Sequence, residues 1–368
     1  MSDLLVVKTL DADSAHAPEF QYLLSHVLLE AREVFDRIEL AVAGETPAPA
    51  EGRRFDAVLL LSSANVLLCR RSLGAMRDLL QAGAQEVRPY RLADVGVDAP
   101  VYTLRGYERA ERAFLERGPA GVPVNPSRRP VSLLTSGRFE SLAAEAPLGG
   151  PEVQTGVGHA GLFHEFIDYY GEVRSDILPF VPAGAREVLE VGCGRGVTGR
   201  LLQETLGCRV TGVELNPVVA REASRHLHRV IQGDVQHLEI EGGYDAVLAL
   251  EVVEHLVDAE GFLSRIRGLL APGGRGILSI PNVGHYSIVE DLIAGRWDYL
   301  PIGLLCYTHY RFFTRRTLAD WLRRSGIERF EIVPQTTELP DRVRDLADRF
   351  ETDPESLSTK GFYVLISP

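Results

Sequence analysis

Short, mostly apolar runs alternate with amphipathic stretches along the larger, C-terminal part of the chain. Runs of this kind and length are typical of strands buried inside a parallel sheet. They lie at 187–191, 209–213, 244–250 and 276–280. The residues between them, such as 198–206, carry apolar side chains at helical spacing. Strands that alternate with helices predict an α/β fold with a doubly wound, mostly parallel sheet.

The first 118 residues show the same alternation on a smaller scale. Strand-like runs lie at 4–8 and 55–61, helical spacing at 17–34, 72–81 and 107–116, an extended segment at 101–104 and a loop at 45–52. Residues 119–158 are rich in Gly, Pro and Ser and have little periodicity, which favours a linker. We therefore predict a small α/β accessory domain at 1–118, a linker at 119–158 and the larger domain at 159–368.

The run 187–191 leads directly into Gly192, Gly194 and Gly196. A turn that brings the backbone close to a ligand needs residues that lack a Cβ atom and tolerate positive φ. Strand, glycine turn and helix in this order place a ligand in the crevice at the carboxyl edge of the sheet. The dinucleotide fingerprint is G-x-G-x-x-G, and here the third glycine comes one residue early.

Acidic side chains follow the next strands at the same edge. Glu214 ends the run 209–213, where a carboxylate can accept hydrogen bonds from both hydroxyls of a ribose. Asp234 follows the apolar pair 230–231, and Glu251 closes the fourth strand. The pattern predicts a nucleotide-like ligand along this edge.

Together with a Pro-Gly-Gly turn at 272–274, this series resembles the class I S-adenosylmethionine-dependent methyltransferases over residues 155–368. The resemblance implies a seven-stranded Rossmann-like sheet whose last strands are 331–333 and 362–366, one of them antiparallel. It also implies S-adenosylmethionine as the cofactor. The implied cofactor residues are Glu190, Gly192, Gly194 and Gly196 at the methionine part, Glu214 at the ribose, Asp234 and the Val235 amide at the adenine, with Cys193, Leu215 and Glu251 beside them. The alternative is a sheet that binds NAD. The G-x-G-x-G spacing argues against it.

Two carboxylates and an imidazole follow the fourth strand at helical spacing. Glu251, Glu254 and His255 are related as i, i+3 and i+4, so one turn of helix would put them on one face. Oxygen ligands suit Mg²⁺ or Mn²⁺, and an added imidazole favours Mn²⁺, Fe²⁺, Co²⁺ or Zn²⁺. Glu-x-x-Glu-His resembles a motif of the O-methyltransferases of ubiquinone biosynthesis and of the small-RNA 2′-O-methyltransferases. In the small-RNA enzymes this motif binds a metal together with a later histidine, which lies in a His-x-x-x-x-Thr segment. The residues 309–314 have that pattern, which implies Glu251, Glu254, His255 and His309 as a metal set.

Other interpretations of these histidines stay open. His255 or His309 could act as a general base on a hydroxyl without any metal, and His285 is a further candidate base. The histidines could also be structural, with Thr314 as the N-cap of a helix at 315–324.

Two segments are expected to border the acceptor. The apolar and aromatic insertion 283–308 would wall its pocket. A helix over 162–170 would cover the cofactor with the lid candidates His164, Tyr169, Tyr170 and Arg174.

Composition narrows the classes of binding partner and the compartment that we expect for this chain. The chain has 368 residues and a net charge of −12, which disfavours nucleic acid or an anionic membrane as a partner. The cysteines at 69, 193, 208 and 306 form no C-x-x-C pair, so we expect free thiols in a reducing compartment. No apolar stretch reaches the ~18 residues of a membrane span, and the N-terminus lacks a signal-peptide layout. We expect a cytoplasmic protein with a small-molecule acceptor and leave a homodimer open.

Residues 1–118 weakly resemble the core of inverting glycosyltransferases of the GT-A fold. In those enzymes a strand running into Leu-Asp-x-Asp supplies metal-binding carboxylates, whereas residues 61–65 here contain none. The resemblance therefore implies a degenerate domain that acts as a scaffold or positions an acceptor.

The expected reaction is O-methylation of a secondary metabolite or sugar-like acceptor, because hydroxyls need the base or metal found here. N- or C-methylation is the first alternative. A cofactor-binding partner protein without methyl transfer is the second.

Overall fold

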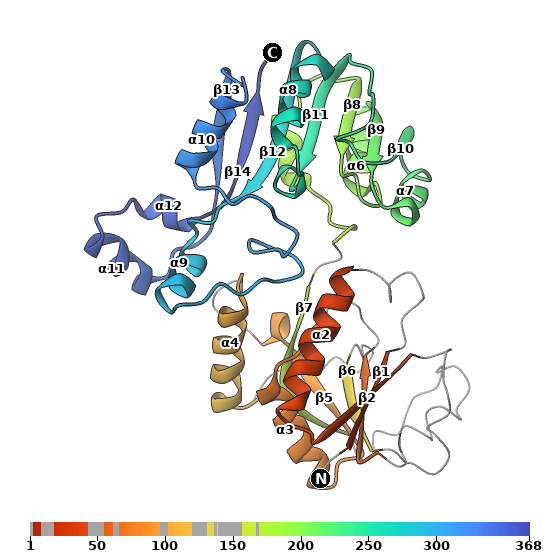
Figure 1. The fold of residues 1–368 in the computed structure, drawn as a ribbon, viewed down its shortest axis with the longest axis vertical. Coiled ribbons are helices and arrows are strands. Elements are labelled where there is room, and N and C mark those ends of the chain that lie inside the picture. Colours follow the sequence, from red (N-terminus) through yellow and green to blue (C-terminus); the bar gives the residue numbers. More distant parts are fainter. Residues whose placement is uncertain are drawn as a thin grey trace. The chain divides into compact units, whose positions relative to one another are not determined.

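The computed structural model describes residues 3–8, 18–42, 55–61, 66–95, 102–119, 131–135, 138, 157–166 and 169–368. The chain divides into two compact units, Met1–Phe166 and Ile167–Pro368. Each unit has a seven-stranded sheet of its own (Figure 1). Residues 62–65 of the stretch that lacks carboxylates and the loop at 45–52 lie outside the described residues.

The first unit is an α/β layer built on a mixed sheet with the strand order β2-β1-β3-β6-β5-β7-β4. Its strands are β1 (Asp3–Lys8), β2 (Arg37–Val42), β3 (Ala57–Leu61), β4 (Val66–Leu67), β5 (Glu86–Arg91), β6 (Val131–Leu134) and β7 (Val157–Glu165). Its helices are α2 (Pro18–Arg32), α3 (Arg70–Gln81), the short η1 (Leu92–Asp94) and α4 (Leu104–Arg117). Strand β1 is parallel to both neighbours, whereas β6 is antiparallel to both β3 and β5.

Alternation along the strands directs apolar side chains to both faces of this sheet. Leu4, Val6 and Leu59 pack with α2 and α3 in one core, whereas Val7 and Val58 lie in a separate cluster. The helices predicted at 17–34, 72–81 and 107–116 are therefore confirmed within a few residues.

The predicted boundaries of the first unit are wrong. Residues 131–134 and 157–165 are strands of its sheet, so the segment 119–158 is not a simple linker. The helix predicted over 162–170 is wrong as well, because β7 runs through Glu165 and pairs with β5 and β4. The apolar side chains of β7 pack in the cores of the first unit, while its backbone pairs with the sheet. The helical spacing of apolar residues does not reveal this strand. Leu104 begins α4 instead of ending a strand, and the Thr103 hydroxyl caps that helix by accepting from the Gly106 amide.

The second unit carries the predicted doubly wound sheet with the order β10-β9-β8-β11-β12-β14-β13. Its strands are β8 (Glu187–Val191), β9 (Arg209–Glu214), β10 (Arg229–Gln232), β11 (Tyr244–Leu250), β12 (Leu270–Pro281), β13 (Phe330–Thr336) and β14 (Thr359–Ile366). Its helical segments are η2 (Ser175–Phe180), α6 (Val197–Leu206), α7 (Pro217–Ala223), η3 (Val253–His255), α8 (Ala259–Leu269), α9 (Tyr286–Ile293), α10 (Arg315–Arg324), α11 (Asp341–Arg349) and α12 (Pro354–Ser358). Strand β14 runs antiparallel to both β12 and β13, so one of the last two strands is reversed, as predicted.

Helices cover both faces of this second sheet. Leu189 and Val247 face the core that contains side chains of α8 and α10. Val188 and Leu248 point the opposite way, into the core that contains side chains of η2 and α6. The strand order reverses between β8 and β11, and a ligand crevice forms at such a reversal in an open α/β sheet. Among the described residues, no helix combines the length and the apolar character that a membrane crossing requires.

Candidate active site

The glycine turn after β8 is confirmed as a place where the backbone needs glycine. Gly192, Gly194 and Gly196 all have positive φ, at 68°, 53° and 76°. A Cβ atom on Gly194 would lie 2.5 Å from the Tyr170 carbonyl oxygen, which is closer than atoms can approach. The Tyr170 carbonyl in turn accepts a hydrogen bond of 2.9 Å from the Arg195 amide. The turn is thus held tightly against the segment that precedes η2.

Glu214 at the end of β9 reaches back to this turn. Its carboxylate accepts hydrogen bonds from the Gly194 amide at 3.0 Å and from the Asn216 amide at 2.8 Å. Burial raises the pKa of Glu214, and these backbone amides partly offset that rise. The carboxylate is therefore oriented at the strand reversal, with lone pairs left for further donors.

Glu190 and Cys193 are also buried next to this turn. The Glu190 Oε2 atom is buried without a hydrogen-bond partner, and a Cβ on Gly199 would lie 2.5 Å from it. Burial raises the pKa of Glu190 to about 8, with a smaller contribution from the charge of Glu214. The Cys193 side chain packs against Gly212 of β9. Glu190 thus lies beside α6, and the Cys193 side chain lies beside β9.

The loop after β10 holds the predicted adenine residues. Asp234 Oδ1 accepts a hydrogen bond of 2.9 Å from the Gln236 amide, which fixes the turn. Val235 is buried, and its carbonyl accepts a hydrogen bond of 3.0 Å from Arg265. Leu215, by contrast, is 65% exposed.

Glu251 does not share a helical face with Glu254 and His255, so that prediction is wrong. Its φ is +52°, in the left-handed region, and the short helix η3 includes only Val253–His255. The Glu251 carboxylate instead accepts a hydrogen bond of 2.7 Å from the Ser279 hydroxyl. The Glu251 amide donates to the same hydroxyl oxygen at 3.0 Å.

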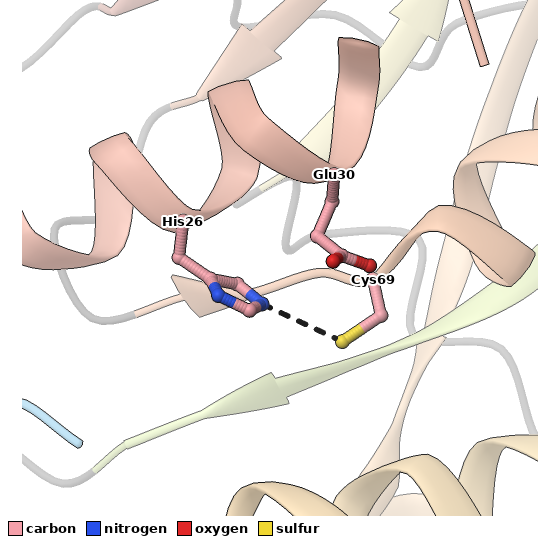
Figure 2. A group of neighbouring side chains, drawn as sticks. All are labelled: His26, Glu30 and Cys69. Atoms are coloured by element: carbon pink, nitrogen blue, oxygen red, sulfur yellow. Dashed lines mark hydrogen bonds between the residues drawn. The ribbon is translucent and has the colours of Figure 1, made fainter. Parts of the chain in front are cut away.

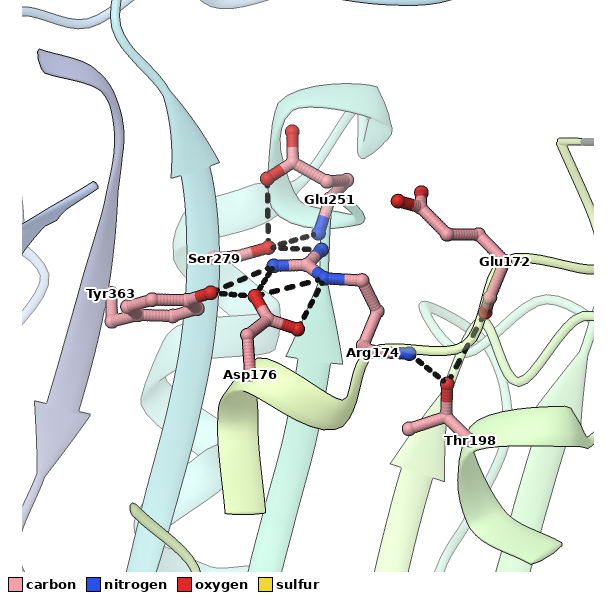
Figure 3. A network of polar contacts seen from close by, with 7 residues as sticks. All are labelled: Glu172, Arg174, Asp176, Thr198, Glu251, Ser279 and Tyr363. Atoms are coloured by element: carbon pink, nitrogen blue, oxygen red, sulfur yellow. Dashed lines mark hydrogen bonds and ion pairs between the residues drawn. The ribbon is translucent and has the colours of Figure 1, made fainter. Parts of the chain in front are cut away.

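A polar network surrounds Glu251 at the carboxyl ends of β11 and β12, as Figure 3 shows. Arg174 donates to Ser279 at 3.4 Å, to Asp176 at 3.1 Å and to the Tyr363 hydroxyl at 3.2 Å. Tyr363 also donates to Asp176. Of these residues only Arg174 and Glu251 were singled out from the sequence. The partners come from β12, β14 and the start of η2, and no local pattern links segments so far apart.

Glu254, His255 and His309 come together, as the sequence predicted. One ligand atom of each lies within 4.8 Å of the others. His309 Nε2 is 4.0 Å from Glu254 Oε1, and the two imidazole rings meet edge to face at 4.6 Å. The Thr308 hydroxyl lies 2.9 Å from His255 Nδ1, which leaves Nε2 of that ring for another partner.

Burial shifts the pKa values of the ionisable side chains in this group. Glu254 is fully buried, and neither of its carboxylate oxygens has a hydrogen-bond partner. Burial and the nearby carboxylate of Glu251 raise the pKa of Glu254. Burial lowers the pKa of His255, and burial together with the neighbouring His255 lowers that of His309 to about 3. The two imidazoles are therefore neutral at pH 7, the state in which histidine binds a metal or accepts a proton.

The remaining candidates take structural positions. His285 is fully buried, with one ring nitrogen 2.8 Å from the Ser287 hydroxyl and the other 3.1 Å from that of Thr337. It caps α9, so we do not assign it the role of a base. Thr314 forms a capping box with Thr317 at the start of α10, as predicted.

The lid candidates belong to two different units. His164 belongs to β7 and packs against Phe166, in the first unit. Tyr169 and Tyr170 meet edge to face at 5.0 Å in the second unit. In the insertion 283–308, Trp297 packs on Phe312. That this insertion walls an acceptor pocket stays a prediction.

The sheet is mostly parallel, and the glycine turn and Glu214 lie where its strand order reverses. These features define the nucleotide- and cofactor-binding class of α/β proteins. Residues 163–332 match the family described as methyltransferase domain. This match covers most of the second unit, which is therefore similar to a methyltransferase domain.

Several known proteins are similar to this part of the chain. A ubiquinone biosynthesis O-methyltransferase of Xanthomonas axonopodis pv. citri is 33% identical over 158 residues, which cover 40% of this chain and 64% of that protein. The enzyme of that name from Nitrosococcus oceani is 26% identical over 45% of this chain and 78% of its own length. A solved S-adenosylmethionine-dependent methyltransferase from Archaeoglobus fulgidus is 20% identical, with a TM-score of 0.41 over 52% of this chain and 90% of that one.

Proposed function

We propose that this protein transfers the methyl group of S-adenosylmethionine to a hydroxyl oxygen of a small molecule. The observation that carries the proposal is the buried group of Glu254, His255 and His309 just past the carboxyl end of β11. This is the edge of the sheet at which the glycine turn and Glu214 lie. A group able to take a proton from a hydroxyl thus stands at the edge where the methyl donor binds.

The cofactor would occupy the strand reversal. Glu214 would accept hydrogen bonds from the two ribose hydroxyls, and Asp234 with the Val235 amide would hold the adenine. The turn at 192–196 would approach the methionine part, with Glu190 beneath it. The positive φ values of the turn and the orientation of Glu214 by two backbone amides support this assignment.

A divalent cation fits the acidic and imidazole group. Glu254 is a buried carboxylate without donors, next to a second carboxylate and two neutral imidazoles. A buried carboxyl of this kind ionises only beside a positive partner, since an unpaired buried charge is strongly disfavoured. Glu254, His255 and His309 would hold the cation, with Glu251 on Ser279 rather than among the ligands. When bound, the cation would lower the pKa of the acceptor hydroxyl.

The residues of the chain then align the acceptor and accept its proton. In the reaction the bond between sulfur and methyl breaks as the bond between oxygen and methyl forms, and S-adenosylhomocysteine leaves. The hydroxyl proton must depart in the same process. If no cation is bound, His255, whose ring is oriented by Thr308, would accept this proton. Positioning of the two reactants supplies much of the rate, because the displacement requires them in line.

Oxygen is preferred over nitrogen because a neutral amine is already nucleophilic and needs no such group. The similar proteins named as O-methyltransferases support this preference. The chain spans 64% of the length of the first of them, so the acceptor is proposed only as a class. The net charge of −12 favours a small acceptor over nucleic acid. Four buried free cysteines favour a reducing compartment such as the cytoplasm.

A screen of hydroxylated acceptors with methyl-labelled S-adenosylmethionine tests the proposal by mass spectrometry. Phenols and sugars are paired with amines of the same skeleton. We expect label on oxygen, and loss of labelling in Glu254→Gln. Label on nitrogen or carbon alone would overturn the choice of oxygen. Cofactor binding without transfer to any acceptor would favour the non-catalytic alternative.

A further inference from the structure

A second group of metal-ligating side chains lies in the first unit, far along the sequence from the methyltransferase domain. His26, Glu30 and Cys69 each offer one ligand atom, and these atoms lie within 4.8 Å of one another. Figure 2 shows the three side chains converging from helix α2 and from the residue before helix α3. We propose that His26, Glu30 and Cys69 bind a zinc ion.

Two of the ligands share one face of a helix. His26 and Glu30 are four residues apart on α2, so their side chains are neighbours on its surface. The third ligand comes from a different element, since Cys69 is the N-cap residue of α3. Ligands on two packed elements form a site that is largely arranged before the metal arrives.

The separation of the donor atoms fits a tetrahedral ion. Cys69 Sγ lies 3.7 Å from His26 Nε2. With Zn–S near 2.3 Å and Zn–N near 2.0–2.1 Å, a tetrahedral angle separates sulfur and nitrogen by about 3.6 Å. Thiolate, imidazole and carboxylate are all common zinc ligands, and water would complete the four.

The Cys69 side chain does not cap helix α3, although Cys69 is its N-cap residue. An N-cap side chain commonly accepts a hydrogen bond from the first turn of its helix, but the Cys69 side chain accepts none. Carboxylates from other helices do this instead. Glu30 Oε2 accepts from the Arg70 amide at 2.8 Å, and Glu111 accepts from the Ser72 amide at 3.0 Å. The sulfur is thereby directed to His26.

The local charge favours a cation. Burial and the carboxylates of Glu111, Glu30 and Glu108 raise the pKa of the Cys69 thiol, and Arg70 opposes them only weakly. Without a metal the thiol stays protonated, and the contact with His26 is a hydrogen bond. Zinc would displace the proton to solvent and bind the thiolate. It would also link α2 to the start of α3.

Cobalt(II) is the probe that separates this site from the group at Glu254. A thiolate bound to Co²⁺ gives a charge-transfer band in the near ultraviolet, and the Glu254 group contains no thiol. The full-length reduced protein, stripped of metal, is titrated with Co²⁺ and then with Zn²⁺. We expect a thiolate band that is complete by about two equivalents, since the Glu254 group can also take Co²⁺, and that Zn²⁺ abolishes by displacement.

Variants identify the ligands. Cys69→Ser should lose the band, and its Zn²⁺ affinity at this site should fall by more than the ~10- to 100-fold that an outer partner costs. Glu30→Gln keeps an oxygen that can accept from the Arg70 amide but removes the charge, so it should fold normally and bind more weakly. The control is Cys306→Ser, whose buried sulfur lies near Thr308, and it should keep the band.

Melting temperatures of the metal-free variants show whether each is folded. Absence of the band in the wild type, or an equal band in Cys69→Ser, would overturn the proposal and leave a thiol hydrogen-bonded to a histidine. Methyl transfer does not enter this test, so its outcome is independent of the proposed function.

Discussion

The Glu214 carboxylate accepts a hydrogen bond of 3.0 Å from the backbone amide of Gly194, which connects the end of β9 to the glycine turn. This contact orients the side chain proposed for the ribose and steadies the turn proposed for the methionine part. One residue would therefore have two roles at the proposed cofactor site, and its loss should affect binding more than stability.

Replacing Glu214 with alanine should weaken S-adenosylmethionine binding strongly. Two charge-assisted hydrogen bonds to the ribose would be lost, each worth about 1.5–3 kcal/mol. We expect an increase in Kd of about 100-fold or more, measured by isothermal titration calorimetry.

The matched control for Glu214 is Glu187→Ala, on the neighbouring strand β8. Glu187 forms an exposed ion pair with Arg209, and such pairs contribute little. Its Kd should be that of the wild type. An unchanged Kd in Glu214→Ala would contradict the assignment of the ribose.

Gly194→Ala should destabilise the second unit more than an alanine at another left-handed glycine. At φ +53° an alanine is strained, and its Cβ would also lie 2.5 Å from the Tyr170 carbonyl. Gly207 has φ +68° and nothing within 4 Å of its Cβ position, so Gly207→Ala isolates the backbone strain. We expect about 1–2 kcal/mol for Gly207→Ala and about 1–3 kcal/mol more for Gly194→Ala.

Denaturant unfolding followed by tryptophan fluorescence measures both glycine variants. Trp297 and Trp321 are the only tryptophans, and both lie in the second unit. Equal losses in the two variants would show that the turn can move away from Tyr170.

The second unit could be predicted closely because its signals are local. Each buried strand is a continuous apolar run, and the run before Gly192 ends in glycines that the turn requires. Glu254 and His255 adjoin in sequence, and His309 was found through a family pattern.

The first unit was harder to predict because its sheet is mixed. Strand β6 at 131–134 has only four residues and lies among glycines and prolines, and β7 carries apolar residues that also fit a helix. Glu251 shows a limit of another kind. Its left-handed φ and its bond to Ser279 depend on β12, and a spacing of three and four residues assumes a helix that does not form.

The stability of the second unit should fall as the pH rises from about 5 to 8, because of Glu190. Burial raises the pKa of Glu190 from 4.5 to about 8. Between those values the unfolded chain has released this proton while the folded protein keeps it, so stability declines with pH. Glu190→Gln should reduce this decline, to which Glu214 and Glu254 also contribute, and should stabilise the unit at pH 8 by on the order of a few kcal/mol.

Asp245→Asn provides a control of opposite sign. The amides of Glu187 and Arg186 lower the pKa of Asp245, so the stability from this carboxylate is present at neutral pH and is lost as the pH falls through that pKa. Asp245→Asn should therefore weaken the unit at pH 7 and less so in acid. Urea midpoints at several pH values measure both variants, and an unchanged pH slope in Glu190→Gln would show that Glu190 is ionised in the folded protein.

Removal of divalent metal should stop methyl transfer without releasing the cofactor. If Glu254, His255 and His309 hold a cation, a chelator should lower kcat by about two to four orders of magnitude, the range of assisted proton removal. Added Mn²⁺, Mg²⁺ or Zn²⁺ should restore it, while the Kd of S-adenosylmethionine stays constant. The Cys69→Ser variant should respond in the same way, which excludes an effect through the first unit. Full activity in excess chelator, with His309→Ala inactive, would instead identify a histidine base. Full activity in both His255→Ala and His309→Ala would exclude both mechanisms, and the acceptor hydroxyl would then have to lose its proton to water.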